Sequence, residues 1–172
     1  MSPTATVRSF IALLPDEQVR QQLAAWRDAW TWPRSATPVK SARLHITLHF
    51  LGDVARDRIP ELADALAVPF TPFMLHLDRL ALWPHGIAVL EPQAVPDALL
   101  ALHGALAVPL REQGLPIDTR PFRPHVTLAR RAQGAVFPVA GSVTEWHIGS
   151  YALMASTWGM DGGYTILRTY PT

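Results

Sequence analysis

The sequence predicts a mixed α+β fold, because strand-like apolar runs alternate along the chain with two long amphipathic helices. Its 172 residues are 49% apolar and 17% charged, which is enough for one ordinary globular core but too little for two. We therefore expect residues 1–172 to form a single domain. This domain looks doubled, since each half has a long amphipathic helix, a proline-containing loop and a strand with a His-x-Thr-Leu motif.

The first half begins with a short buried strand, VRSFIALL at residues 7–14, which Pro15 closes. Asp16 is placed to cap the helix that follows. One apolar face of that helix is made by Val19, Leu23, Trp26 and Trp30. The helix should end near residues 32–33, and a Pro/Ser/Thr loop then leads into the strand RLHITLHFLG, which we expect to stop at Gly52.

The middle of the chain should contain a short helix at about residues 56–67, a strand at 73–82, a turn at WPHG and a strand at 86–92. A second amphipathic helix is predicted over residues 96–114 from the spacing of Leu99, Leu102, Leu106 and Leu110. Pro109 should kink or shorten its last turn, and Gly114 is suited to cap its end.

The last part of the chain is expected to be strands. The second motif strand is RPHVTLARRA, which begins at Arg123. VTEWHIGSYALMAS at residues 143–156 and YTILRTY at 164–170 are predicted as the last two strands, with MDGG at 160–163 as the turn between them.

Two strands carry the same pattern, HITL at residues 45–48 and HVTL at 125–128. One His-x-Thr match means nothing in a chain with seven histidines, but two matches that include the leucine have a chance expectation of roughly 0.002. Because alternate residues of a strand share a face, His45 lies beside Thr47 and His125 beside Thr127. Either histidine alone would be an ordinary strand residue, and the duplication favours a catalytic pair.

Such a pair suits the cleavage of a phosphodiester by in-line displacement. One base must take a proton from the attacking oxygen and one acid must give a proton to the leaving oxygen. Imidazole can act as either near neutral pH, since its unperturbed pKa is about 6.5. The hydroxyls of Thr47 and Thr127 can donate to the non-bridging phosphate oxygens as charge shifts between them.

Composition argues against several other classes of function. The chain has no cysteine, so it has no disulfides, thiolate nucleophiles or zinc-thiolate sites. A net charge of +1 does not suit binding along many phosphates of a duplex. No acidic cluster lies near either motif, so no metal or other cofactor is expected. Because the chain lacks an apolar run of 18 residues and a signal peptide, we expect a soluble, cytoplasmic protein.

Four stretches resemble a known family, the 2H phosphoesterases, and within it the bacterial and archaeal RNA 2′,3′-cyclic phosphodiesterases, also called 2′-5′ RNA ligases. These stretches are SFIALLP, LHITLHFLGDV, PFMLHLDRLALWP and RPFRPHVTLAR, and they spread over nearly the whole chain. The resemblance implies a two-lobed, LigT-like α+β fold with pseudo-twofold symmetry. In that fold antiparallel sheets line a central cleft and the helices lie outside.

The resemblance also implies a reaction and roles for the histidines. The reaction is hydrolysis of an RNA 2′,3′-cyclic phosphate to a 2′-phosphomonoester, with a reverse activity that joins 2′-5′ linked ends. His45 would be the proton donor and His125 the proton acceptor, an assignment that the symmetric motifs alone leave open. The expected partners are RNA ends or short oligonucleotides with a 2′,3′-cyclic phosphate, no membrane is involved, and the chain is expected to be a monomer.

Three more residues are candidate substrate contacts. His49 has the phase of His45 along its strand, although Ala129 holds the equivalent place in the second motif. Periodicity turns Arg130 away from the histidine face unless the strand bulges, whereas the resemblance makes it a phosphate contact or a contact at the rim of the cleft. Phe122 would either stack on a base or pack the loop before the second motif.

Two other functions remain open at this stage. The same site would suit a small cyclic nucleotide instead of RNA, and comparing rates on a cyclic mononucleotide and a cyclic-ended oligomer would separate the two. The chain would alternatively be a nucleotide-binding module without catalysis, which tight nucleotide binding with no turnover would indicate.

Overall fold

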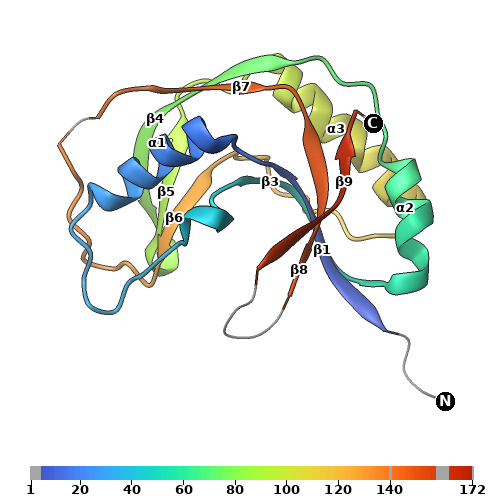
Figure 1. Ribbon diagram of the computed structural model, residues 1–172, viewed down its shortest axis with the longest axis horizontal. Helices are drawn as coiled ribbons and strands as arrows, with labels where there is room; N and C mark the ends of the chain where they lie inside the picture. The colour runs from blue at the N-terminus through green and yellow to red at the C-terminus, as the bar shows by residue number, and fades with distance from the viewer. Residues whose placement is uncertain (1–4, 140, 158–162, 172) are drawn as a thin grey trace.

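The computed structural model describes residues 5–139, 141–157 and 163–171. Within these residues, nine strands form one curled antiparallel sheet against which the helices pack (Figure 1). The strands are β1 (Thr6–Leu13), β2 (Thr37–Pro38), β3 (Ile46–Ala55), β4 (Phe73–Trp83), β5 (Ile87–Pro92), β6 (Val126–Arg130), β7 (Thr144–Ile148), β8 (Tyr151–Ser156) and β9 (Tyr164–Tyr170). The helices are α1 (Glu17–Asp28), α2 (Ile59–Ala65) and α3 (Asp97–Glu112), with short 3-10 turns η1 (Ser41–Arg43), η2 (Arg56–Arg58) and η3 (Pro84–Gly86).

The two motif strands, β3 and β6, lie side by side in the middle of the sheet. The strand order is β7-β4-β5-β6-β3-β1-β8-β9, and β2 pairs with β6 off this path. The antiparallel pairing of β3 with β6 joins Ile46 to Val126, the residue after the motif histidine in each half. The halves β6-β5-β4-β7 and β3-β1-β8-β9 extend from this seam in opposite directions. The predicted α+β fold with pseudo-twofold symmetry is confirmed.

The two long helices are exchanged between the halves. Helix α1 precedes β3 in the chain but packs against β6 and β7, where Trp26 Nε1 donates to Thr144 Oγ1 at 2.9 Å. Helix α3 precedes β6 but packs against β3, where His49 Nε2 donates to the His103 carbonyl at 2.9 Å. Each motif strand is therefore supported by the helix that precedes the other motif.

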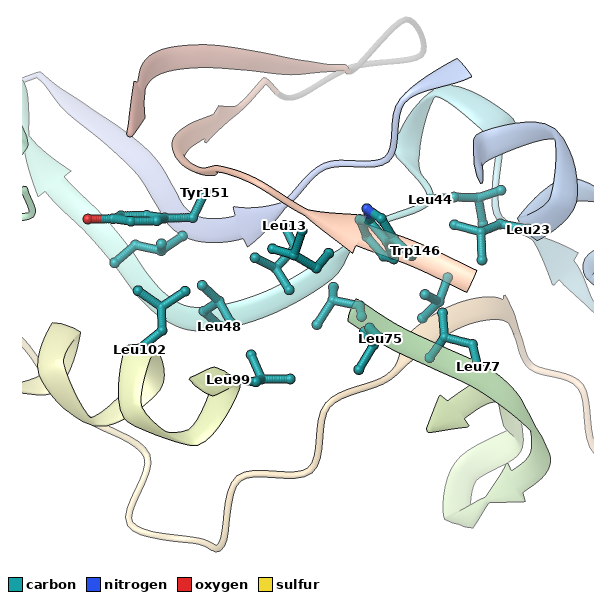
Figure 2. Close-up of a cluster of buried hydrophobic side chains, with 14 of the residues drawn as sticks. Leu13, Leu23, Leu44, Leu48, Leu75, Leu77, Leu99, Leu102, Trp146 and Tyr151 are labelled. Carbon is teal, nitrogen blue, oxygen red and sulfur yellow. The ribbon is translucent and has the colours of Figure 1, made fainter. Parts of the chain in front are cut away.

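A continuous hydrophobic core fills the space between the sheet and these helices. Figure 2 shows Leu99 and Leu102 of α3 close to Leu48 of β3. Leu44 and Ile46 are buried in the same core, so alternate residues of the first motif strand face the helices. Burying each of these side chains stabilises the fold by about 1.5–3 kcal/mol. The opposite side of the motif strand, which carries His45, is thereby held away from the helices.

The predicted start of α1 and the predicted end of α3 are close to those observed, but the predicted end of α1 near residues 32–33 was wrong, because the helix ends at Asp28 and Trp30 follows it. Asp16 caps α1 by accepting a hydrogen bond from the Val19 N–H at 2.8 Å. Pro109 does not shorten α3, which continues to Glu112, and the Gln113 N–H donates to the Pro109 carbonyl at 2.9 Å. The expected shortening was wrong, because Pro109 lies one turn from the helix end and removes one hydrogen bond while its ring is buried. Gly114 ends the helix with a φ of 73°, as predicted.

Several predicted strand boundaries were wrong. Both motif strands begin three residues later than predicted, at Ile46 and Val126. Strand β3 does not stop at Gly52 but continues to Ala55, because a glycine with a φ of 74° fits a bulge opposite Ser9. Residues 143–156 are not one strand, since the chain leaves the sheet at residues 149–150. Strand β7 pairs with β4 in one half, and β8 pairs with β1 in the other. The turn predicted at 160–163 lies largely outside the described residues.

The hydroxyl of Tyr151 ties β8 to the segment after α2. It donates to the Leu66 carbonyl at 2.7 Å and accepts from the Val68 N–H at 3.0 Å, while the ring stacks on Tyr170 at 4.8 Å. The side chain is fully buried. Water therefore cannot replace these hydrogen bonds if the hydroxyl is removed.

We expect Tyr151→Phe to lower the free energy of unfolding by about 1–3 kcal/mol, because it leaves a buried carbonyl and a partly buried N–H without a partner. Urea unfolding followed by circular dichroism measures the change. Tyr164→Phe is the matched control and should change stability by less than about 0.5 kcal/mol, since Tyr164 is exposed. Equal midpoints for wild type and Tyr151→Phe would show that this hydroxyl does not anchor the fold.

Candidate active site

A cleft of about 370 Å³ lies over the seam between β3 and β6 and contains both His-Thr pairs. Its walls come from the motif strands, from β2 and the loop after it, and from β5, β9 and the end of β4. The lining residues are Thr37, Pro38, Val39, Lys40, Arg43, His45, Thr47, Trp83, Ile87, His125, Thr127, Arg130 and Tyr164. The four residues of the two motifs that were predicted to be catalytic are thus brought together in one place.

The antiparallel register explains why they meet. His45 and His125 each stand immediately before their strand, and the pairing of Ile46 with Val126 lies between them. Extending this register by one residue places His45 opposite Thr127. By the same step Thr47 lies opposite His125. The seam therefore brings the His-Thr pair of one strand opposite the His-Thr pair of the other, and the two strands run in opposite directions.

The two histidine rings are held in the same way. His45 Nδ1 lies 2.6 Å from the carbonyl oxygen of Arg43, and His125 Nδ1 lies 2.8 Å from that of Arg123. Because a carbonyl oxygen only accepts, Nδ1 is the protonated nitrogen in each ring. In the neutral form the lone pair is then on Nε2. His45 Nε2 lies 2.9 Å from Thr47 Oγ1, whereas within the described residues His125 Nε2 has no such partner.

Burial lowers the pKa of both histidines below its ordinary value. The hydrogen bonds to the carbonyls of Arg43 and Arg123 act in the opposite direction and raise the pKa, since they favour the charged ring. The positive charge of Arg130 lowers the pKa of both rings further. The cleft of the free protein thus favours neutral imidazoles.

Each motif histidine is next to an aromatic ring that an arginine covers. His45 contacts Tyr164 with ring centroids 5.3 Å apart, and the Arg43 guanidinium lies 5.6 Å from the Tyr164 ring. His125 contacts Trp83 at 4.3 Å, and the Arg123 guanidinium lies 4.6 Å from the Trp83 ring. Both arginines stand two residues before their histidine. The repeated unit is thus Arg-x-His-x-Thr-Leu, a signal that would have extended the predicted motif, although neither aromatic residue was predicted.

The two sides of the cleft differ in charge. Arg123 makes two hydrogen bonds, of 2.8 and 3.0 Å, to the buried carboxylate of Glu91, which also accepts one from Trp83 Nε1 at 3.2 Å. In the described part of the chain, no carboxylate forms an ion pair with Arg43. The His45 side therefore keeps positive charge that is neutralised on the His125 side.

Equivalent bulges follow the two motif threonines. In β3, Ala12 pairs with Thr47 and Ile11 with His49, so Leu48 is the extra residue. In β6, Val89 pairs with Thr127 and Ala88 with Ala129, so Leu128 is the extra residue. A bulge reverses the alternation of side chains after it. Arg130 consequently lines the cleft, although simple alternation turned it away.

The bulge at Leu48 turns His49 out of the cleft, so its predicted phase with His45 was wrong. His49 is buried beneath α3, where its ring stacks on His103 at 4.1 Å, and His103 stacks on Phe122 at 3.9 Å. Neither His49 nor Phe122 is among the residues that line the cleft. Phe122 packs the loop before the second motif, the second of the two alternatives considered from the sequence.

The cleft is basic along one rim. Lys40, Arg43 and Arg130 line it, and none of the described residues that line it carries a carboxylate. Among the residues that the structure describes, no group of three or more His, Asp or Glu could hold a metal ion. Nor does the described chain contain a helix long and apolar enough to cross a membrane. The cleft is suited to bind an anion whose leaving group takes up a proton as it departs.

Two His-Thr pairs that face one another in a basic cleft, on a pseudo-symmetric antiparallel sheet, define a two-histidine phosphoesterase. The family model described as "LigT like Phosphoesterase" matches residues 13–88 and 90–146. The chain belongs to this LigT-like phosphoesterase family.

Relatives and solved structures agree with this assignment. The RNA 2′,3′-cyclic phosphodiesterase of Escherichia coli K12 is 32% identical over 87% of this chain and 87% of its own length. The protein of that name from Thermus thermophilus is 30% identical over 95% of this chain and 89% of its length. The crystal structure of E. coli LigT complexed with 3′-AMP matches with a TM-score of 0.87 and 28% identity, over 96% of this chain and 97% of that one.

The stacked rings of His49, His103 and Phe122 beneath α3 should make the stability of the protein depend on pH. The pKa of His103 is lowered to about 4, first by burial and then by the neighbouring His49, whose pKa burial also lowers. The unfolded chain then binds more protons than the folded chain between about pH 4 and 6.5. Stability from this source is fully present above about pH 6.5 and is lost as the pH falls to about 4.

We expect His103→Phe to lose less stability than wild type between pH 7 and pH 4.5, by on the order of 1 kcal/mol because the side chain is partly exposed. Urea unfolding at the two pH values measures the difference. His147→Phe, a change of an exposed histidine on β7, is the control and should keep the wild-type dependence. If His103→Phe lost as much stability as the wild type between the two pH values, the lowered pKa of His103 would not be the cause of the pH dependence.

Proposed function

We propose that the protein hydrolyses RNA 2′,3′-cyclic phosphodiesters to 2′-phosphomonoesters, with water as the nucleophile. The observation that carries the proposal is the meeting of two equivalent His-Thr pairs across the β3–β6 seam inside one cleft. The E. coli and T. thermophilus relatives are named RNA 2′,3′-cyclic phosphodiesterases, which supports the same reaction for this chain.

The cyclic phosphate would lie between the two motifs. The hydroxyls of Thr47 and Thr127 would donate to its non-bridging oxygens, which gain charge as water attacks phosphorus. Arg130 lies at the cleft wall near both histidines and would pair with the same oxygens. Lys40 and Arg43 add positive charge at the rim, where an incoming anion meets them first.

His125 would act as the base and His45 as the acid. Water attacks phosphorus while His125 Nε2 takes its proton, and His45 Nε2–H gives a proton to the 3′ oxygen as the P–O3′ bond breaks. The products are a 2′-phosphate and a 3′ hydroxyl. The absence of a partner on His125 Nε2, among the described residues, supports its use by water. Thr47 Oγ1 keeps His45 Nε2 directed into the cleft.

The same proton transfers would serve ligation. If the 5′ hydroxyl of a second RNA end replaces water, His125 takes the proton from that hydroxyl and the product is a 2′-5′ linkage. The reaction as proposed needs no metal ion. We place the protein in the cytoplasm, because a cysteine-free chain suits a reducing compartment. There it would act on RNA ends as a monomer.

The direct test is incubation with an RNA oligomer that ends in a 2′,3′-cyclic phosphate. We expect a 2′-phosphate as product, with activity retained in EDTA. His45→Ala or His125→Ala should each lower turnover by about 10²- to 10⁴-fold, because each removes one of the two proton transfers. Product position is read by mass spectrometry together with 31P NMR.

Three variants and the product separate the alternatives. His147→Ala, at an exposed position on β7, should keep wild-type turnover. Near-normal hydrolysis by either motif variant would contradict the mechanism, as would complete loss of activity on chelation. A 3′-phosphate product would show that the P–O2′ bond breaks and not the P–O3′ bond, so that the 2′ oxygen is the leaving group. Tight nucleotide binding without turnover would favour a binding module instead.

We expect a bell-shaped pH profile of kcat/KM whose maximum lies below about pH 6.5, because burial lowers the pKa of both histidines. Activity should fall on the acid side as the base becomes protonated and on the alkaline side as the acid loses its proton. Arg130→Gln should move the whole profile to higher pH, since it removes a charge that lowers both pKa values. A maximum above about pH 7.5 in the wild type would contradict the expectation.

A further inference from the structure

The buried carboxylate of Glu91 lies next to His125 but does not line the cleft. Glu91 is only 4% exposed, although a carboxylate is rarely buried unless it is paired. Leu90 of β5 pairs with Val126 of β6. Extending this antiparallel register by one residue places Glu91 opposite His125. Because paired residues have their side chains on the same face of a sheet, the Glu91 side chain is on the face that carries His125.

Three hydrogen bonds hold this carboxylate in place. Arg123 donates from Nε to Oε2 of Glu91 at 2.8 Å and from Nη2 to Oε1 at 3.0 Å. Trp83 Nε1 donates to the same Oε1 at 3.2 Å. Arg79 of β4 also pairs with Glu91 in the sheet, but these two side chains form no ion pair. The two parallel bonds from one guanidinium fix the orientation of both Arg123 and Glu91.

Both partners of Glu91 hold the ring of His125. The carbonyl oxygen of Arg123 accepts a hydrogen bond from His125 Nδ1 at 2.8 Å. The Trp83 ring contacts the His125 ring with centroids 4.3 Å apart, and the Arg123 guanidinium lies 4.6 Å from the Trp83 ring. Glu91 therefore joins the hydrogen-bond partner and the packing partner of the ring to one buried anchor. With Nδ1 bonded in this way, Nε2 is the nitrogen that is left to meet a substrate.

The charge of Glu91 also acts on His125. Burial is the largest effect on the pKa of His125 and lowers it, whereas the hydrogen bond to the Arg123 carbonyl and the negative charge of Glu91 raise it. The positive charges of Arg123 and Arg130 lower it further, and His45 faces the ring across the seam. Glu91 thus opposes the effect of burial and helps His125 to accept a proton, which a general base must do.

We propose that Glu91 is a positioning residue for His125 and holds it as the proton acceptor through Arg123 and Trp83. This inference rests on the proposed function, with His125 as the base. Glu91 would not touch the substrate, since it does not line the cleft. A carboxylate that faced the cleft would repel an anionic substrate, so its burial away from the cleft suits an indirect role.

Histidine titration followed by NMR tests this placement in the free protein, without a substrate. In the wild type, the ring nitrogens of neutral His125 should show the proton on Nδ1, as the hydrogen bond requires. Glu91→Gln should move the midpoint of His125 to lower pH, because it removes a charge that raises the pKa of this ring. The midpoint of His45 should move less, since Glu91 is not among the groups that shift its pKa. His45→Ala and His125→Ala assign the signals.

Arg123→Gln provides a second variant with the opposite sign. It removes a positive charge that lowers the pKa of His125, so the midpoint of His125 should move to higher pH. The Arg123 side chain is largely exposed, whereas that of Glu91 is buried. The Arg123 variant therefore keeps the test available if Glu91→Gln does not fold.

Kinetics on an RNA oligomer with a 2′,3′-cyclic phosphate end test the consequence for the reaction. Glu91→Gln should lower kcat by about 10-fold and change KM by less than about 2-fold, because a misplaced base slows proton transfer but leaves phosphate binding intact. The acid side of the kcat/KM profile should move to lower pH, since the base then takes up its proton at lower pH. Glu145→Gln, which changes an exposed carboxylate on β7, is the matched control and should keep the wild-type kcat and profile.

The outcomes separate this inference from the proposed function. If the wild type does not hydrolyse the oligomer, the proposed function fails, while the NMR titration still tests whether Glu91 holds His125. Equal midpoints of His125 in the wild type and Glu91→Gln would overturn the inference, as would an unchanged midpoint in Arg123→Gln. A shift of His45 as large as that of His125 would also overturn it, because Glu91 would then act on the whole cleft. A rise in KM with kcat unchanged would show that Glu91 supports binding and not the base.

Discussion

The pairing of Ile46 with Val126 is the interaction on which the rest of the site depends. It joins two half-sheets that the chain builds separately, and it does so at the residue next to each motif histidine. Because both residues are fully buried, the seam is held by the core as well as by the sheet. A shift of one residue would turn every motif side chain to the other face, so the core that fixes this register also fixes the distance between the two His-Thr pairs.

Much of this arrangement could be predicted from the sequence, because strands, helices and caps depend on local patterns. Asp16, Gly114 and the apolar faces of α1 and α3 are of this kind. The faces of His49 and Arg130 could not be predicted, since the bulges at Leu48 and Leu128 are set by the partner strands. The separation of β7 from β8 depends in the same way on distant pairing, and so do the contacts of Trp83 and Tyr164 with the motif histidines.

The two motifs are nearly identical, so any difference in role between the histidines must come from their surroundings. Both rings donate through Nδ1 to the carbonyl two residues earlier, and both lie beside an aromatic ring. Glu91 neutralises Arg123 on one side, while on the other side Arg43 forms no ion pair with a carboxylate of the described residues. An anionic chain is attracted to the second side, and this attraction would give a symmetric pair of acids and bases a single direction of reaction.

Substrate charge completes the electrostatics of the cleft. In the free protein, burial and Arg130 hold both histidines toward the neutral form, which suits the base but not the acid. A bound cyclic phosphate brings a negative charge between the rings and opposes the effect of Arg130 on each of them. One proton taken up with the substrate is then shared by two coupled rings, and it resides on the ring whose Nε2 faces the leaving oxygen. On this argument the phosphate itself produces the mixed protonation that acid-base catalysis needs, and the basic rim acts mainly on binding.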